Sequence, residues 1–287
     1  MSHPTVLPYQ RRRLQAHFAF TKIPFRKNMW ATEMFDSRSQ RELHQGLGLW
    51  TEIAGLALVT GPAGVGKSIT VRRFIADLDE TRFKVFRFAY LPSTVVGFLR
   101  SLSRTLDIRM RLHAADLFDA AQQQLASYAA EHGPHPILVI DDAEGLSMPI
   151  LDLIRRLTAY ELDAEDRFSI LLGGTEELLA NLRHPNLDAL RSRIGYAHGL
   201  RAFSHEDTRN YIRFHLKRVD ADEHLFSDDA ARRIFQASQG KPRHINQLAL
   251  QALVQAAVQG VEEITGDFMK SLLNTHPLYQ AGAGDSP

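Results

Sequence analysis

The 287-residue sequence predicts an α/β fold in which a parallel sheet is flanked by helices, followed by a small all-helical domain. Two observations support this prediction. Short apolar runs alternate with stretches of helical periodicity up to Leu200, and from Arg201 onward only helical patterns occur. Hydrophobic residues make up 44% of the chain, which is enough to bury a core in each part.

Four apolar runs have the character of strands that are buried on both faces of a parallel sheet. They are GLALVT at 55–60, FKVFRFAYL at 83–91, PILVID at 136–141 and FSILLGG at 168–174. Helical patterns lie before and between them, for example over 39–50 and 116–132. Strands that alternate with helices in this way pair in parallel, because each helix carries the chain back to the start of the next strand.

The helical region contains signals for helix starts and stops. Ser204 is followed three residues later by Asp207, which is a capping pattern, and Gly240 is suited to a helix stop. Further helices are predicted over 242–260 and 265–273. The expected organisation is a basic arm and lead-in segment over 1–38, an α/β domain over 39–200, a helical domain over 201–275 and a disordered tail over 276–287.

The composition excludes several classes of site. The chain has no cysteine, so disulfides and thiolate metal sites are excluded, which fits a reducing compartment. The thirteen histidines lack a metal-ligand spacing, and His184, His205 and His244 are expected to be surface or capping residues. No apolar run approaches the roughly 20 residues that span a bilayer, and no secretory signal begins the chain. We therefore expect a cytoplasmic protein without a membrane segment.

The charge is balanced overall but not locally. A formal net charge of +1 gives no global attraction for nucleic acid. The residues before Glu33 nevertheless include no acidic side chain and six basic ones, Arg11, Arg12, Arg13, Lys22, Arg26 and Lys27. This arm is either a solvated terminus or a surface that contacts DNA or a partner.

The stretch GPAGVGKS at 61–68 lies between the first predicted strand and a helix, and it fits the phosphate-binding pattern G-x-x-x-x-G-K-[ST]. In such a loop, backbone amides at the helix start cradle phosphate oxygens. Lys67 neutralises the outer phosphates and Ser68 offers its hydroxyl to magnesium. ATP and Mg²⁺ are the expected cofactors, and the residues assigned to nucleotide binding are Gly61, Pro62, Ala63, Gly64, Val65, Gly66, Lys67, Ser68 and Ile69.

Hydrolysis of ATP also needs carboxylates near this loop. Asp141, at the end of the third predicted strand, is expected to hold the metal through water. Asp142 and Glu144 are the two candidates for the group that orients and deprotonates the attacking water. A third possibility is slow hydrolysis, in a protein that works mainly as an ATP-dependent switch.

Taken together, several motifs make the chain resemble the AAA+ ATPases of the ExeA/TniB type, a group that includes transposition regulators related to TnsC, MuB and IstB. The resemblance covers residues 17–275, and its marks are FTKIPF, GPAGVGKS, ILVIDDAE, LLGGTEELLANL, LDALRSRI and GKPRHIN. The chain departs from many related ATPases at Asp142, where they carry glutamate.

The resemblance implies roles for further residues. Thr175 falls where the family has a polar sensor that touches the γ-phosphate or the lytic water, and a helix N-cap is an equally open role. Arg193 matches an arginine finger that is inserted into the ATP site of a neighbouring subunit, with Arg191 as the alternative. Arg243 matches the second sensor, which lets the helical domain feel the γ-phosphate.

The family's mechanism implies a homo-oligomer, a ring or a helical filament, whose assembly depends on ATP. We expect a slow ATPase, stimulated by DNA or a partner, that regulates DNA transposition through target selection and recruitment of a transposase. The alternative is an ExeA-like ATPase of a secretion or envelope-assembly system. The short stretch after the helical domain favours transposition.

DNA contacts in this family lie in the region after the second strand. In this chain that region contains Arg100, Arg104, Arg109 and Arg111. Positions 100 and 104 are one helical turn apart, so both side chains can meet successive phosphates of double-stranded DNA, with little sequence specificity. A solvated helix face is the alternative interpretation.

Overall fold

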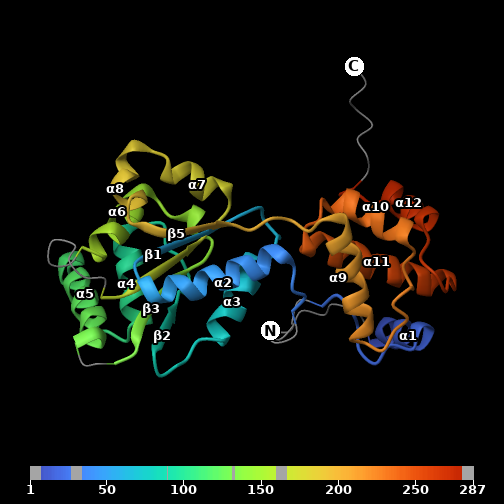
Figure 1. The fold of residues 1–287 in the computed structure, drawn as a ribbon, viewed down its shortest axis with the longest axis horizontal. Helices are drawn as coiled ribbons and strands as arrows, with labels where there is room; N and C mark the ends of the chain where they lie inside the picture. The colour runs from blue at the N-terminus through green and yellow to red at the C-terminus, as the bar shows by residue number, and fades with distance from the viewer. Residues whose placement is uncertain (1–7, 27–33, 89, 131–132, 160–166, 280–287) are drawn as a thin grey trace, which may run out of the picture. The chain divides into compact units, whose positions relative to one another are not determined.

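The computed structural model describes residues 8–26, 34–88, 90–130, 133–159 and 167–279 (Figure 1). The chain divides into two compact units. One contains residues 38–63 and 67–201 and is called the α/β unit here. The other contains residues 1–37, 64–66 and 202–287 and is called the helical unit.

A five-stranded parallel sheet forms the centre of the α/β unit (Figure 1). Every residue of its strands β1 and β4 is buried, as expected for apolar runs that helices cover on both faces. The predicted α/β class and parallel pairing are therefore confirmed. In spatial order the strands are β2 (Phe83–Arg87), β3 (His135–Ile140), β4 (Ser169–Gly173), β1 (Leu56–Thr60) and β5 (Ile194–Gly199).

Helices connect the strands and bury their apolar faces against the sheet. Phe98 and Ile154, for example, join Leu138 and Leu172 of the sheet in one core. This core holds the carboxyl ends of β1, β3 and β4 next to one another. The helices are α2 (Arg38–Ile53), α3 (Lys67–Ala76), α4 (Val95–Thr105), α5 (Ala114–Ala130), η2 (Ala143–Gly145), α6 (Met148–Leu157), α7 (Glu176–Leu182), η4 (Pro185–Leu187) and α8 (Asp188–Arg191).

Both edge strands differ from the sequence prediction. β5 was not predicted at all, because Gly195 and Gly199 interrupt its sequence and its residues alternate between half-buried and exposed. The second predicted strand was too long: β2 ends at Arg87, where its pairing with β3 reaches Val139. An edge strand has only one neighbour, so its hydrophobic pattern is weaker than that of a central strand.

The helical unit consists of α1 (Pro8–Phe18), α9 (His205–Lys217), α10 (Asp228–Ser238), α11 (Pro242–Gln259) and α12 (Gly266–Thr275). Ser204 and Asp207 form the predicted capping box, in which Ser204 Oγ accepts the Asp207 N–H at 3.0 Å and the Asp207 carboxylate accepts the Ser204 N–H at 3.1 Å. The predicted stop near Gly240 is also confirmed. Its φ is +67°, and a Cβ atom there would overlap the carbonyl oxygen of Phe203.

The N-terminal residues contribute to the core of the helical unit. Leu14 of α1 is buried there, together with Phe20, Ile23 and Phe25 of the lead-in segment. Arg13 donates a hydrogen bond from Nη2 to the carbonyl oxygen of Val258 at 3.2 Å. Part of the basic arm is therefore anchored on α11, whereas Lys27 lies outside the described residues.

The structure describes the first four residues of the predicted tail, 276–279. His276 is buried, and its ring lies 4.7 Å from the ring of Tyr279. The Tyr279 ring also lies 5.8 Å from the ring of His244 in α11, so this segment packs on the helical unit. Residues 280–287 lie outside the described part of the chain.

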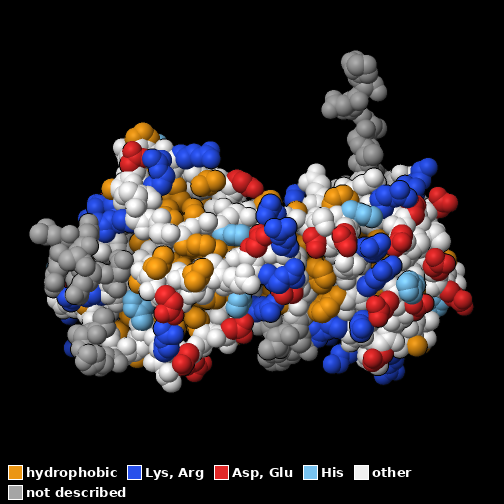
Figure 2. Space-filling model, viewed as in Figure 1, with side chains coloured by type: hydrophobic (Ala, Val, Ile, Leu, Met, Phe, Trp, Pro, Cys, Tyr) orange, Lys and Arg blue, Asp and Glu red, His pale blue; other side chains and the backbone are white. Residues whose placement is uncertain are grey.

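The two units present different surfaces (Figure 2). On the face shown, hydrophobic side chains gather over the α/β unit around α2 and β5, while Lys, Arg, Asp and Glu are mixed over the helical unit. Leu49 and Ile53 of α2 are 73% and 63% exposed. The mixed signs leave this face of the helical unit without a uniform positive surface for DNA.

Candidate nucleotide-binding site

The predicted phosphate-binding loop joins β1 directly to α3. Its glycines Gly61, Gly64 and Gly66 have φ values of +146°, +81° and +110°, a backbone conformation that favours glycine. α3 begins at Lys67, so the amide groups of its first turn have no carbonyl partner inside the helix. A loop of this shape at a helix N-terminus fits an anionic phosphate group.

Lys67 is only 7% exposed, and carbonyl groups of the loop accept hydrogen bonds from its ammonium group. Its Nζ donates hydrogen bonds to the carbonyl oxygens of Gly61 at 2.8 Å and Pro62 at 3.2 Å. The next residue, Ser68, is exposed, and Ile69 is half-buried. The ammonium group is thus held at the loop, where phosphate oxygens would be its competing partners.

Asp141 follows the last residue of β3 and lies against the end of β4. Ile140 pairs with Leu172, and Gly173 pairs with Val59 of β1, so these strand ends meet at one edge of the sheet. A Cβ atom on Gly173 would lie 2.8 Å from Oδ1 of Asp141. Glycine at position 173 therefore leaves room for the carboxylate.

The donor set at this edge suits magnesium, which prefers oxygen ligands. Ser68 would supply a hydroxyl, and the Asp141 carboxylate would hold the ion through water. Within the described residues, no group of three or more His, Cys, Asp and Glu side chains could hold a metal ion. A magnesium ion at this edge would consequently depend on phosphate oxygens of the nucleotide.

The two candidate catalytic carboxylates have different surroundings. Asp142 is exposed and has left-handed backbone angles, φ 54° and ψ 36°, and its N–H donates to Oδ1 of Asp141 at 3.0 Å. Glu144 is half-buried in η2, and its Oε2 accepts the N–H of Thr175 at 3.2 Å. Glu144 thereby ties η2 to the turn between β4 and α7.

Thr175 occupies the N-cap position of α7, but its side chain makes no capping hydrogen bond. Its position directly after Gly173 and Gly174 puts it at the same sheet edge as Asp141. A Cβ atom on Gly174 would lie 2.9 Å from Oε2 of Glu144. The glycines at 173 and 174 thus leave room for the side chains of Asp141 and Glu144. The double glycine in FSILLGG is the signal in the sequence that could have predicted this arrangement.

Arg193 lies at the amino-terminal ends of the strands, whereas the phosphate-binding loop lies at their carboxyl ends. It immediately precedes β5, which runs parallel to β1, whereas the loop follows the end of β1. Arg193 is half-buried, and its Nη1 donates to Oγ1 of Thr158 at 3.3 Å. Arg191 is exposed and forms an ion pair with Asp188 at 2.6 Å.

Arg243 is the second residue of α11 in the helical unit and is exposed. Of the three histidines that were expected to be surface or capping residues, His184 and His205 meet this expectation. His184 is the N-cap of η4 and accepts the Asn186 N–H through Nδ1 at 3.2 Å. His205 is an exposed residue at the start of α9, and His244 is half-buried in α11.

The predicted DNA-contacting arginines are all exposed. Arg100 and Arg104 lie in α4, and Arg109 and Arg111 lie in the segment after it. None of the four forms an ion pair with another residue in the described part of the chain.

Among the helices that can be described, none has the length and apolar character required to cross a membrane.

Comparison with known proteins shows what this chain is similar to. Residues 51–182 match the family model of the AAA domain, and this segment runs from the end of α2 to the end of α7. The parallel sheet, the phosphate-binding loop and the match together define a P-loop fold of the AAA+ class.

The sequence identity to an individual curated relative is low. The chain is similar to General secretion pathway protein A of Aeromonas hydrophila, with 28% identity over 238 residues, which cover 81% of this chain and 43% of that protein. The chain therefore spans less than half the length of this curated relative.

Two solved structures share the fold. Cdc6p from Pyrobaculum aerophilum matches with a TM-score of 0.61 and 21% identity over 84% of this chain and 67% of that chain. The DNA-bound ORC1 protein of Aeropyrum pernix matches with a TM-score of 0.60 and 15% identity over 88% of this chain and 72% of that chain.

Proposed function

We propose that this chain is an ATP-hydrolysing AAA+ switch that assembles with further copies of itself, binds duplex DNA with little sequence specificity, and regulates DNA transposition by recruiting a transposase to a target. The transposition role rests on the motif set described above. The DNA-binding role rests on the exposed arginines of α4 and the segment after it.

The chain's own residues divide the work at the ATP site. The amides of the loop and the Lys67 ammonium would bind the phosphates, and Ser68 and Asp141 would hold Mg²⁺. The metal, when bound, supplies neutralisation of the developing phosphate charge. Asp142 or Glu144 would orient and deprotonate the attacking water, with Thr175 beside them as a sensor.

The position of Arg193 supports the proposal of self-assembly. The length of β5, six residues at about 3.3 Å each, separates Arg193 from the ends of the strands that carry the phosphate-binding loop. An arginine side chain is too short to span that distance, so Arg193 can serve as a finger only for the site of another copy. Arg243, on α11, would act as the second sensor.

The observation that carries DNA binding is the set of four exposed arginines without acidic partners among the described residues. Arg100 and Arg104, one helical turn apart, can contact successive phosphates. Phosphate contacts of this kind bind every duplex similarly.

The test is to measure binding of a fluorescent duplex, with a non-hydrolysable ATP analogue, at several salt concentrations. We expect the double variant Arg100→Ala/Arg104→Ala to bind at least about tenfold more weakly and to reduce the salt slope by about two. Arg183→Ala, which removes another exposed arginine of the α/β unit, is the matched control. An unchanged salt slope in the double variant would contradict this surface.

A second candidate function is an ATPase of a secretion or envelope-assembly system. The similarity to General secretion pathway protein A favours it. Electron microscopy with and without duplex DNA separates the two: assemblies that need both the ATP analogue and DNA support transposition regulation, and assemblies that form equally without DNA support the secretion role.

A further inference from the structure

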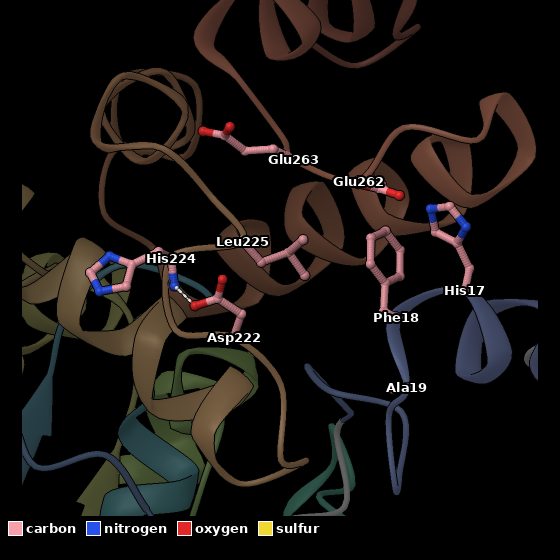
Figure 3. Close-up of a pocket in the computed structure, with 8 residues that line it drawn as sticks. All are labelled: His17, Phe18, Ala19, Asp222, His224, Leu225, Glu262 and Glu263. Carbon is pink, nitrogen blue, oxygen red and sulfur yellow. Dashed lines mark hydrogen bonds between the residues drawn. The ribbon is translucent and has the colours of Figure 1, made fainter.

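A pocket in the helical unit lies apart from the residues assigned to ATP and DNA. Its volume is about 540 Å³, and it is open to solvent and bordered by the end of α1, the loop between α9 and α10, and the loop between α11 and α12 (Figure 3). The lining residues are His17, Phe18, Ala19, Asp222, His224, Leu225, Glu262 and Glu263. A volume of this size is typical of sites that bind a small molecule or a few residues of a peptide.

Hydrogen bonds fix the walls of this pocket. His17 Nε2 lies 2.8 Å from the carbonyl oxygen of Val261, which joins α1 to the loop after α11. Ile264 donates its N–H to the carbonyl oxygen of Leu225 at 2.9 Å, which joins the two loops to each other. Asp222 Oδ1 accepts the His224 N–H at 2.9 Å. The pocket is therefore formed before any ligand arrives.

The pocket combines an apolar floor with acidic walls. Leu225 is buried, and the Phe18 ring stacks on the Phe20 ring at 5.2 Å. Figure 3 shows Phe18 and Leu225 near each other, with acidic side chains around them. Asp222, Glu262 and Glu263 are exposed, and the lining contains neither lysine nor arginine.

This combination selects the chemistry of the ligand. Three carboxylates in a lining that has two histidines but neither lysine nor arginine repel phosphates and nucleic acids and attract a cation. A metal ion is a poor fit, because none of the described acidic and histidine residues forms a metal-binding group. An organic cation with an apolar stem matches both the carboxylates and the floor.

We propose that this pocket binds an arginine side chain of a partner protein. A guanidinium group forms paired hydrogen bonds with a carboxylate and stacks on an aromatic ring, whereas an ammonium group does neither as well. The aliphatic stem of arginine would contact Leu225, and its planar head would lie between Phe18 and the acidic walls.

The test uses acetyl-arginine-methylamide as the probe and acetyl-citrulline-methylamide as its uncharged, nearly isosteric control. Amide NMR signals of the labelled full chain are followed during each titration. We expect the arginine probe to shift the signals of residues 18–19, 224–225 and 262–263 with a dissociation constant on the order of 1 mM. Citrulline should shift them at least about tenfold less.

A matched pair of variants assigns the binding to this pocket. Glu262→Gln/Glu263→Gln should weaken the arginine probe at least about fivefold, while Asp267→Asn, which neutralises an exposed acid of α12 outside the lining, should not. Equal shifts with citrulline, no shift with arginine, or loss of binding only in Asp267→Asn would overturn the proposal. Tighter binding of spermidine than of the arginine probe would instead assign the pocket to a free polyamine and would also overturn it.

Discussion

The two units of this protein use their polar side chains for different purposes. In the α/β unit, Lys67 donates to the carbonyl oxygen of Gly61 in the loop after β1, and Gly173 leaves room for the Asp141 carboxylate after β3. In the helical unit, Ser204 and Asp207 satisfy the start of α9, and buried His215 accepts the N–H of Phe25 at 3.3 Å. Polar residues at the first location are the ones that we propose bind a ligand, and those at the second support the fold.

This difference has a measurable consequence. Substitutions at the sheet edge should alter ATP binding or hydrolysis while the chain stays folded, because the core of the α/β unit is built from other, apolar side chains. Substitutions at the polar positions of the helical unit should lower the free energy of unfolding. The predictions below test this contrast, from the largest effect to the smallest.

The largest effect is expected for Lys67→Ala. Loss of the ammonium group should weaken ATP binding about 1000-fold, or about 4 kcal/mol, because this charge is held at the phosphate-binding loop. Binding is measured with a fluorescent ATP analogue, and Lys270→Ala in the helical unit is the control. Normal ATP affinity in Lys67→Ala would remove the nucleotide site from this loop.

One chemical change, glycine to alanine, compares the units directly. Gly240→Ala should lower the free energy of unfolding by about 3 kcal/mol, because its φ is +67° and the added Cβ overlaps the Phe203 carbonyl oxygen. Gly173→Ala should change stability by less than about 1.5 kcal/mol. It should nevertheless slow ATP hydrolysis at least about tenfold, because the Cβ displaces Asp141.

Gly48→Ala provides the control for both, since a Cβ atom there would meet nothing within 4 Å. Urea unfolding and steady-state hydrolysis are the measurements. If Gly173→Ala unfolds the α/β unit as readily as Gly240→Ala unfolds the helical unit, the contrast between the units is wrong.

Burial of His215 predicts a pH dependence of the helical unit. Desolvation by burial, followed by the nearby charge of Arg218, lowers the pKa of His215 to about 3. The unfolded chain takes up the proton near the ordinary pKa of about 6.5, while the folded chain does not. The stabilising effect is therefore complete above that pH and is lost as the pH falls toward 3, with a slope of up to about 1.4 kcal/mol per pH unit.

The measurement is urea unfolding between pH 7 and pH 5. His215→Gln should flatten the slope, because the titrating group is removed. His224→Gln replaces an exposed histidine of the same unit and serves as the control. An identical slope in wild type and His215→Gln would show that the acid sensitivity comes from other residues.

The smallest expected effect is a difference in the free energy of unfolding between substitutions at two N-cap residues, Ser204 and Thr175. Ser204→Ala should cost about 1 kcal/mol, since its hydroxyl caps α9 within the capping box. Thr175→Ala should cost less than about 0.5 kcal/mol, because its side chain makes no capping bond. If Thr175→Ala also slows hydrolysis, the sensor role is supported; a loss of stability equal to that of Ser204→Ala would assign it to capping.

Features encoded by short spacings could be predicted from the sequence. The apolar runs of β1, β3 and β4 depend on residues next to one another, and so do the loop ending at Lys67 and the Ser204–Asp207 box. Local sterics and helix-end hydrogen bonding determine such features, so the order of residues is sufficient. β5 escaped prediction because its glycines and half-buried pattern carry too weak a local signal.

By itself, then, the sequence determined the α/β class, the phosphate-binding loop and the carboxylate that follows β3. Only the tertiary structure decided that Gly173 makes room for Asp141 and that Glu144 accepts the Thr175 N–H. It also decided that Arg193 lies at the ends of the strands away from the phosphate-binding loop. It decided as well that three separate segments line the acidic pocket. These arrangements depend on the order and register of segments far apart in the chain, which local spacing does not encode.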